Sequence, residues 1–297
     1  METISMRLSH VARAVNGNRK ILRYLLSVDP SLEHTFHYSV EDWKTLLRLS
    51  SSKAQTLFQF LHNSNQQLET RQYAHQNIIL TSFDEAFPAT LRNIPDPPLV
   101  LYVMGDVSLL NSLSLSVVGT RKPTLSAYSK MEYILKPVIQ KQCVIVSGLA
   151  KGIDTFAHQI ALQHSGSTIA VLAFGFKHCY PLENRVLMKE LASDHLLISE
   201  YPPFQRPQKW YFPERNRLIS GLGYGTFVIE AMERSGSLIT ADQALEQGKE
   251  VYALPGDIQS SASKGCNNLI QQGAKLVQHP QDIMEDIEHE AQMMGGL

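Results

Sequence analysis

Short, strongly apolar runs recur along the chain from Leu115 onward, and they constrain the fold more than any other feature of the sequence. In order, the runs read LSVVG, CVIVSG, TIAVLAFG, LLISE, TFVIEA, EVYALPG and AKLV. Amphipathic segments lie between them near residues 126–140, 154–165, 184–193 and 239–247. Strands this apolar are buried on both faces, which requires helices above and below the sheet. Residues 111–285 are therefore predicted to form an extended Rossmann-like α/β domain with a doubly wound, mostly parallel sheet.

The first part of the chain has a different period. Apolar residues recur at three-and-four spacing in ILRYLLSV, WKTLLRLS and AQTLFQFLH, with polar breaks between them. This spacing predicts several short helices over residues 1–76, in a small all-α domain that precedes the sheet. Such a domain serves either as an interaction module or as a packing or dimerisation accessory, and its residues do not decide between the two.

A connector rich in proline joins the two regions over residues 77–110. It contains Pro88, Pro95, Pro97 and Pro98. Because proline cannot donate to a sheet ladder, the connector should be extended and docked on a neighbour, with LVLYVMG as an edge strand. At the other end of the chain, PQDIMEDIEHEAQMMGGL predicts a last helix that frays into a tail over residues 286–297.

Composition limits the kinds of site that the chain can carry. Charged residues make up 19% of the sequence and the formal net charge is -1, so any site for a polyanion must be a local basic patch. Cys143, Cys179 and Cys266 are far apart, which suggests neither a disulfide framework nor a zinc site. The N-terminus lacks a signal-peptide pattern, and no apolar run is long enough to cross a bilayer. A cytoplasmic protein without a metal or cofactor is expected.

Polar, glycine-containing loops follow four of the predicted strands. In open parallel sheets, ligands bind beyond the carboxyl ends of the strands, where backbone amides and helix N-termini point outward. One such loop alone could equally be an ordinary strand-to-helix turn, but four at one sheet edge favour an anion site. None matches the GxGxxG or GxxxxGK[ST] fingerprint, which disfavours a standard NAD or ATP enzyme. The candidate residues of these loops are Gly119, Thr120, Arg121, Lys122, Ser147, Gly148, Lys151, Gly152, Ser235, Gly236, Ser237, Lys264 and Asn267.

The segment YPPFQRPQKWYFPERNRLISG interleaves cations with aromatic residues. Single-stranded nucleic acid is bound by such mixtures, because cations follow the backbone while aromatic faces stack on bases. Aromatic residues in a loop over a sheet also cover the core. About half of the four aromatic residues Phe204, Trp210, Tyr211 and Phe212 are therefore expected to pack inside. Lys177, which follows the TIAVLAFG strand, is predicted to join Arg121 in one basic pocket. The candidates in the segment are Arg206, Lys209, Phe212, Arg215, Asn216 and Arg217, with Phe204, Trp210 and Tyr211 as the other aromatic residues.

An ordered set of motifs resembles the DNA-processing protein A (DprA/Smf) family of natural transformation. The motifs are VGTRKPT, SGLAKGIDTFAH, GFKHCYPLEN, SEYPP, FPERNRLISGL, GTFVIEA, SGSLITADQALEQGKEVYALPG and KGCNNLIQQGA, and they extend over roughly residues 87–277. The resemblance implies a sterile-alpha-motif-like helical module followed by an extended Rossmann fold. It also implies a non-enzymatic homodimer that binds and protects incoming single-stranded DNA and loads the recombinase RecA onto it.

The same resemblance carries further expectations about site and partners. It implies a basic DNA pocket formed by Arg121, Lys177 and the segment from Arg206 to Arg217. Single-strand-binding protein and other competence proteins are possible partners. Many relatives carry a C-terminal winged-helix domain, and none is expected in this chain.

An enzyme is the main alternative that the sequence leaves open. GLGYGTFVIEA loosely resembles the PGGxGTxxE signature of nucleotide-binding phosphoribohydrolases. In that interpretation Glu230, with Arg215 or Arg217, would contact the ribose. However, Leu222 separates the two glycines that should be adjacent, and the leading proline is absent. A pure protein-interaction adaptor is a third reading, which explains the helical module but not the basic loops.

Overall fold

A nine-stranded sheet forms the centre of the molecule in the computed structural model, which describes residues 3–76 and 78–295. The strand order is β1-β2-β6-β5-β4-β3-β7-β8-β9. β1 pairs antiparallel with β2, β2 pairs antiparallel with β6, and every other neighbouring pair is parallel. The strands are β1 Ile79–Thr81, β2 Val100–Gly105, β3 Ser114–Val118, β4 Val144–Ser147, β5 Thr168–Leu172, β6 Leu196–Ser199, β7 Gly225–Val228, β8 Glu250–Ala253 and β9 Lys275–Leu276. The predicted mostly parallel α/β fold is confirmed.

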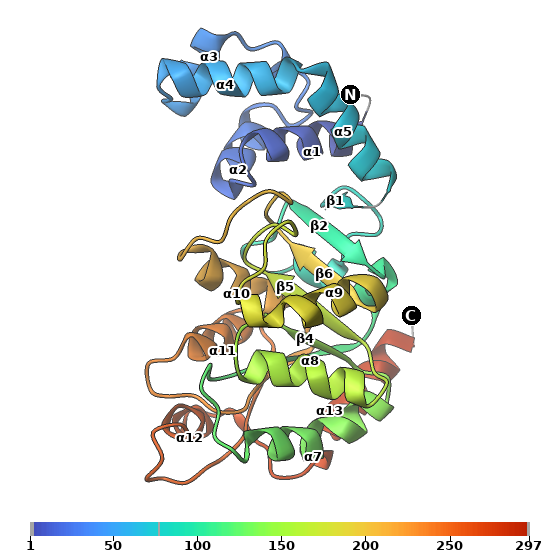
Figure 1. The fold of residues 1–297 in the computed structure, drawn as a ribbon, viewed down its shortest axis with the longest axis vertical. Helices are drawn as coiled ribbons and strands as arrows, with labels where there is room; N and C mark the ends of the chain where they lie inside the picture. The colour runs from blue at the N-terminus through green and yellow to red at the C-terminus, as the bar shows by residue number, and fades with distance from the viewer. Residues whose placement is uncertain (1–2, 77, 296–297) are drawn as a thin grey trace.

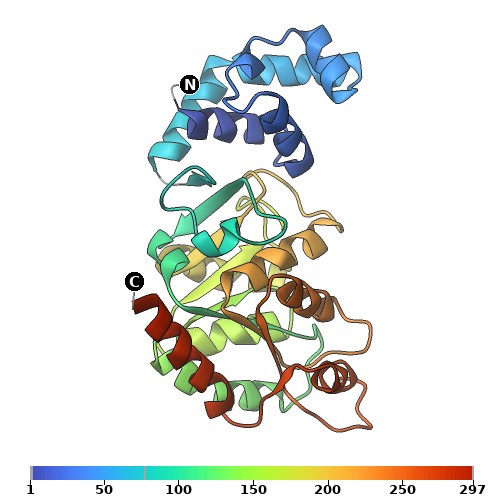
Figure 2. The same cartoon turned by 180° about the vertical axis from the view of Figure 1, so that it is seen from behind.

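Helices cover both faces of this sheet, as Figures 1 and 2 show from opposite sides. Side chains of α7, α8 and α13 share one hydrophobic core with β3, β4, β7 and β8, and those of α6, α10, α11 and α12 share a core on the other face. α9 packs over β5 and β6. The helices are α6 Ala89–Arg92, α7 Ala127–Gln140, α8 Ile153–Gln163, α9 Arg185–Asp194, α10 Tyr211–Leu222, α11 Gly236–Glu246, α12 Lys264–Gln271 and α13 Gln281–Gly295, with 3-10 turns η2 Val107–Asn111 and η3 Leu182–Asn184.

The first residues form a helical layer on the β1–β2 end of the sheet (Figure 1). Its elements are α1 Ile4–Ala14, α2 Arg19–Val28, η1 His34–Phe36, α3 Val40–Leu47, α4 Ser51–His62 and α5 Ser64–His75. Their core, which includes the fully buried Trp43, also takes in Ile79, Val100 and Tyr102 of β1 and β2. The helical layer and the sheet are therefore joined by a shared core.

Three predicted details need correction. LVLYVMG is not an edge strand, because the short β1 pairs with it on its outer side. The boundary at residue 285 falls inside α13, and Ile283 and Ile287 of that helix are buried in the core. The aromatic and basic segment is not all loop, because α10 begins at Tyr211. Residues 1–2, 77 and 296–297 of the predicted module, connector and tail lie outside the described residues.

Candidate nucleic-acid interface

Three strand-end loops converge where the strand order reverses. β3 lies between β4 and β7, so the loop after β3 turns toward one half of the sheet and the loop after β7 toward the other. Such a switch point is where open α/β sheets bind ligands. A cavity of about 460 Å³ opens there, which we call the strand-end cavity. Ten of the predicted site residues line it, namely Gly119, Thr120, Arg121, Lys122, Phe212, Arg215, Asn216, Ser235, Gly236 and Ser237.

The loop after β3 is held in place by Glu230, which follows β7. The backbone N–H of Thr124 donates to Glu230 Oε2 at 2.9 Å, and the Thr124 hydroxyl donates to Oε1 at 2.5 Å. The N–H of Thr120 donates to the backbone carbonyl of Glu230 at 2.7 Å. Both ends of the turn that carries Arg121 are thus tied to the neighbouring strand end.

Arg121 is an exposed cation beside an aromatic face. Its guanidinium carbon lies 5.9 Å from the centre of the Phe212 ring, within the range of a cation–π contact. Tyr180 meets the same ring edge-on, with ring centres 5.5 Å apart. Within the described part of the chain, no carboxylate forms an ion pair with Arg121. The guanidinium is therefore available to an external anion.

A second arginine lies buried at the floor of the strand-end cavity. Arg215 of α10 donates from Nη1 to the backbone carbonyl of Gly148 at 2.6 Å and also to that of Val171. Burial lowers its pKa to about 10, so it is still protonated at neutral pH. Nearby Asp154 accepts from the N–H of Gly148 at 3.1 Å and from that of Ala150 at 3.3 Å, and burial raises the pKa of this carboxyl. Arg215 therefore acts as a fixed charge beneath the cavity.

The start of α11 forms a third wall of the cavity. Ser235 caps the helix by accepting from the N–H of Ser237 at 3.3 Å, and the two hydroxyl oxygens lie 2.6 Å apart. Amide groups at a helix N-terminus carry partial positive charge and bind anions readily. Arg234, exposed just before the cap, also lines the cavity. Arg234 was not among the predicted site residues, although it stands in the same glycine- and serine-containing loop.

Lys177 and Arg206 are not in the strand-end cavity. They line a separate cavity beside α9, so the prediction that Lys177 and Arg121 share one pocket is wrong. The segment after β5 is held by the loop that follows β6, since the N–H of Lys177 donates to the carbonyl of Pro203 at 2.8 Å. This hydrogen bond ties the backbone at Lys177 to the loop that follows β6.

Arg217 is engaged inside the protein. Its two terminal nitrogens each donate to the Glu200 carboxylate at 2.7 Å, and its Nε donates to Asp96 at 3.0 Å. The side chain is 6% exposed. The sequence does not indicate these ion pairs, because Glu200 and Asp96 lie in other segments of the chain that only the fold brings to Arg217. Arg217 has a structural role in this arrangement and does not face the strand-end cavity.

Several other predicted residues support the loops instead of lining the cavity. Ser147 donates to the carbonyl of Val117 at 2.7 Å, and Asn267 exchanges hydrogen bonds with Gly256 at 3.1 and 3.2 Å. Lys151 is paired with Glu183. Gly152 has a φ of +78° at the start of α8, where an added Cβ would lie 2.5 Å from the Thr120 carbonyl oxygen. Lys209 and Lys264 are exposed outside the cavity.

The aromatic residues of the segment divide between core and surface. Tyr211 stacks on the buried Tyr201 with ring centres 3.8 Å apart. Phe212 lines the strand-end cavity. Trp210 is 59% exposed and Phe204 is 41% exposed. Of these aromatic residues, Phe212 lines the strand-end cavity, while Trp210 and Phe204 are exposed outside it.

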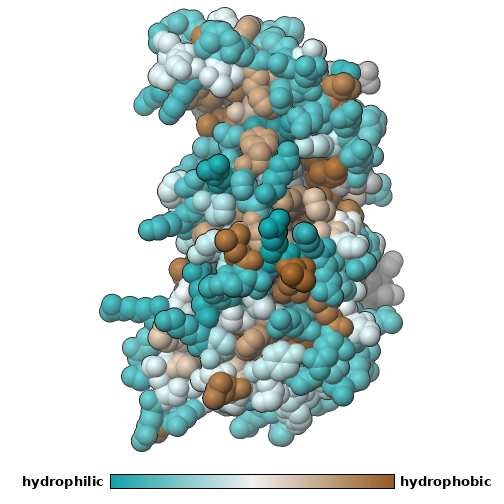
Figure 3. Space-filling model, viewed as in Figure 1, coloured by the Kyte–Doolittle hydropathy of each residue, from teal (hydrophilic) through white to brown (hydrophobic). Residues whose placement is uncertain are grey.

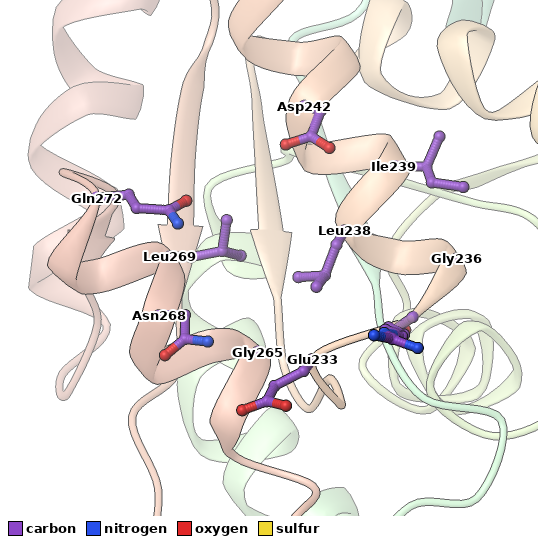
Figure 4. A pocket seen from close by; sticks show the side chains of 11 residues that line it. Glu233, Gly236, Leu238, Ile239, Asp242, Gly265, Asn268, Leu269 and Gln272 are labelled. Carbon is purple, nitrogen blue, oxygen red and sulfur yellow. The ribbon is translucent and has the colours of Figure 1, made fainter.

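A larger cavity of about 570 Å³ lies between α11 and α12. Figure 4 shows the carboxylates of Glu233 and Asp242 among the side chains around it, with Asn268 and Gln272 on the α12 side. Two carboxylates against the single cation Arg234 make this space a poor site for a polyanion. It is also outside the switch point of the sheet.

The fold and the strand-end cavity define a Rossmann-like α/β protein whose switch point carries an exposed arginine beside an aromatic ring. The chain belongs to the DNA recombination-mediator protein A family, whose model matches residues 78–288. It is a recombination mediator of that family and not an enzyme of the phosphoribohydrolase kind. Consistent with this, the Glu230 carboxylate, which an enzyme would present to a ribose, is occupied by Thr124.

Similar proteins support the assignment. The chain is 48% identical to the DNA processing protein DprA of Bacillus subtilis over 202 residues, which is 68% of either chain. It is 45% identical to DprA of Streptococcus pneumoniae over 205 residues, covering 69% of this chain and 72% of the other. The crystal structure of that protein superimposes with a TM-score of 0.77, covering 94% of this chain and 95% of that chain at 35% identity. A DNA processing protein A structure from Helicobacter pylori, whose title describes a single-stranded DNA binding mode, matches with a TM-score of 0.65 at 29% identity, covering 71% of this chain and 96% of that one.

Two further observations concern metals and membranes. Among residues 3–76 and 78–295, no group of three or more His, Cys, Asp or Glu side chains is placed to hold a metal ion. Within the same ranges, no helix has the length and apolar character that crossing a bilayer requires.

Proposed function

We propose that the chain binds single-stranded DNA at the strand-end cavity. The observation that carries the proposal is the exposed, unpaired Arg121 against the face of Phe212, at the switch point of the sheet. Arg121, Lys122 and Arg234 would contact phosphates, while the amide N–H groups at the start of α11 would donate hydrogen bonds to a further phosphate oxygen. A base would stack on Phe212, which contributes roughly 1 to 3 kcal/mol per stacked base. Lys209 would extend the contact along the strand.

The biological role that we propose follows from the family. The protein would protect incoming DNA during natural transformation and load RecA onto it, acting as a cytoplasmic homodimer. Single-strand-binding protein and other competence proteins would be further partners. The Helicobacter pylori relative, whose title names single-stranded DNA binding, supports the DNA part of this proposal.

A titration of fluorescent oligothymidine tests the DNA site. The affinity should fall steeply as salt rises, because DNA binding releases counterions from the phosphates. Arg121→Glu should weaken binding about tenfold or more and reduce the salt slope, since it removes one cation and adds a repulsive charge. The measurement is fluorescence anisotropy over a salt series, with a thermal melt to check folding.

Lys136→Glu is the matched control, because Lys136 is an exposed lysine on α7 that lines none of the cavities described above. Its affinity for oligothymidine should stay close to that of the unmodified protein. Equal losses for both variants, or an affinity that does not change with salt, would contradict the proposed site.

A further inference from the structure

A second cavity, here called the α9 cavity, lies beside α9 and holds about 540 Å³. It is bounded by α9, the exposed end of β2 and the segments that follow β5 and β6. Figure 3 shows hydrophobic and hydrophilic surface side by side over the middle of this face, where α9 lies in Figure 1. Its apolar lining consists of Met104, Phe176, Leu182, Met188, Ala192 and Leu197, and its basic lining of Lys177, Arg185, Lys189 and Arg206.

The four cations around the α9 cavity are unpaired. All four are exposed, and within the described residues none of their side chains has a hydrogen bond or an ion pair. Among the described residues no acid lines the cavity, although α9 itself carries Glu190 and Asp194, with Glu183 just before it and Glu69 on α5. Glu183 is already paired with Lys151, and the Lys177 ammonium makes only a small contribution to the lowered pKa of Glu69 on α5. The rim of the cavity therefore carries a local excess of positive charge.

The floor of the α9 cavity differs in chemistry from the strand-end cavity. It is formed mainly by thioether and aliphatic side chains, among which Met188 and Leu197 are buried, while Met104 is 40% and Leu182 is 74% exposed. Met and Leu adapt to an inserted apolar side chain but offer no flat ring on which a base could stack. Two rings are among the described lining residues: Phe176 packs into two neighbouring hydrophobic clusters, and His178 is held with its Nε2 2.9 Å from the carbonyl oxygen of Phe204.

We propose that the α9 cavity binds an acidic peptide segment of a partner protein that carries one large apolar side chain. The apolar side chain would fill the space between Met188, Leu182 and Met104, and the carboxylates of the peptide would meet the surrounding cations. Charge complementarity selects an acidic partner, and the aliphatic floor favours a peptide over a nucleic acid. This site is separate from the strand-end cavity and shares none of its lining residues.

The test uses a short fluorescein-labelled peptide that is rich in Asp and contains one Phe, alongside the same peptide with Ala in place of Phe. The protein should bind the Phe peptide more tightly than the Ala peptide. Arg185→Glu combined with Lys189→Glu should lower the affinity for the Phe peptide about tenfold or more, because two attractive charges become repulsive. Leu182→Ala should lower the affinity for the Phe peptide several-fold and leave the affinity for the Ala peptide unchanged.

Lys53→Glu combined with Lys136→Glu provides a control with the same change in net charge, on exposed lysines of α4 and α7. All the substituted side chains are exposed, so a thermal melt should show folded protein throughout. Peptide binding that responds equally to the two charge reversals would overturn the proposal. So would a loss of oligothymidine affinity in the Arg185/Lys189 variant without any peptide binding, which would assign the cavity to DNA.

Arg121→Glu separates this inference from the proposed DNA site. It should leave the affinity for the Phe peptide unchanged while weakening oligothymidine binding. A parallel loss of both ligands would show that one surface serves both, and it would contradict the separate peptide site.

Discussion

At the scale of single residues, Gly148 decides where the buried arginine of the strand-end cavity lies. A Cβ added at this position would come within 2.5 Å of Arg215 Nη1 and 2.6 Å of its Cζ. The guanidinium can approach the Gly148 carbonyl only because there is no side chain in this space. The role of Gly148 is therefore to leave room for the Arg215 guanidinium, and this explains the glycine without any direct contact between it and a ligand.

Gly148→Ala should therefore displace Arg215 and destabilise the protein. Overpacking of this kind costs about 1 to 3 kcal/mol. Chemical denaturation should show the loss in the free energy of unfolding. Gly236→Ala is the control, because an added Cβ there meets nothing within 4 Å, and its stability should be unchanged. Equal stability of the two variants would mean that the Arg215 side chain can adopt another position at no cost in the free energy of unfolding.

The sequence predicted the kinds of residue in the site better than their roles. Arg121, Arg215 and Arg217 are the same type of side chain, and all three were expected to face a phosphate. Whether an arginine is free depends on which carboxylates and carbonyls the fold brings to it. For Arg217 these are Glu200 after β6 and Asp96 in the connector, 121 residues away in the case of Asp96. No local pattern in the sequence contains that information.

At the scale of elements, the buried strands could be read directly from the sequence because they are short and continuously apolar. Helix α10 was not recognised, since Pro213 and its aromatic neighbours are typical of a loop. Proline is tolerated in the first turn of a helix, where its missing N–H would have no partner in the helix anyway. The edge position of β2 was misjudged because β1, which covers it, spans only Ile79–Thr81.

The packing of α8 against β5 should make stability depend on pH through His158. This imidazole is fully buried, its Nδ1 lies 2.7 Å from the Thr168 hydroxyl oxygen, and Nε2 has no partner. The Thr168 hydroxyl donates to the carbonyl of Ile145, so the hydrogen-bond pattern assigns the proton of the neutral ring to Nδ1. Burial lowers the pKa of His158 from 6.5 to about 3.

A depressed histidine pKa means that protons bind preferentially to the unfolded chain. The contribution of His158 to stability is therefore present above about pH 6.5 and is lost as the pH falls, by about 2 kcal/mol at pH 5. Denaturation at pH 7 and pH 5 should show a smaller loss for His158→Asn, whose amide can still donate to Thr168. His37→Asn, at an exposed position, should keep the full loss. The same loss in all three proteins would rule out His158 as the titrating group.

At the scale of the whole molecule, a network of charges ties the helical layer to the sheet. The Asp96 carboxylate forms ion pairs with Arg19 at 3.2 Å and Arg23 at 2.5 Å, both on α2, and with Arg217 of α10 at 3.0 Å. Burial raises the pKa of Asp96, but the three guanidinium groups lower it more, so the net shift is downward. The helix that carries Phe212 is thereby linked to the N-terminal helices.

Asp96→Asn should loosen this link. Hydrogen bonds to charged groups contribute roughly 1.5 to 3 kcal/mol, and an amide replaces only part of the attraction. Hydrogen exchange should become faster in the amides of α2, with little change in the central strands. Asp242→Asn, at an exposed carboxylate of α11 that forms no ion pair among the described residues, should leave hydrogen exchange in α2 unchanged. Unchanged protection of α2 in the Asp96 variant would mean that the shared apolar core alone holds the layer.

The contacts of Glu230 with Thr120 and Thr124 have a consequence for the energetics of DNA binding. Ordering the backbone of a flexible loop costs about 1 to 2 kcal/mol per residue. Here that entropy is lost when the protein folds, because the turn carrying Arg121 is anchored at both ends before any ligand arrives. Such preorganisation removes a penalty from association, so the affinity for DNA would reflect contacts and counterion release with little contribution from loop ordering.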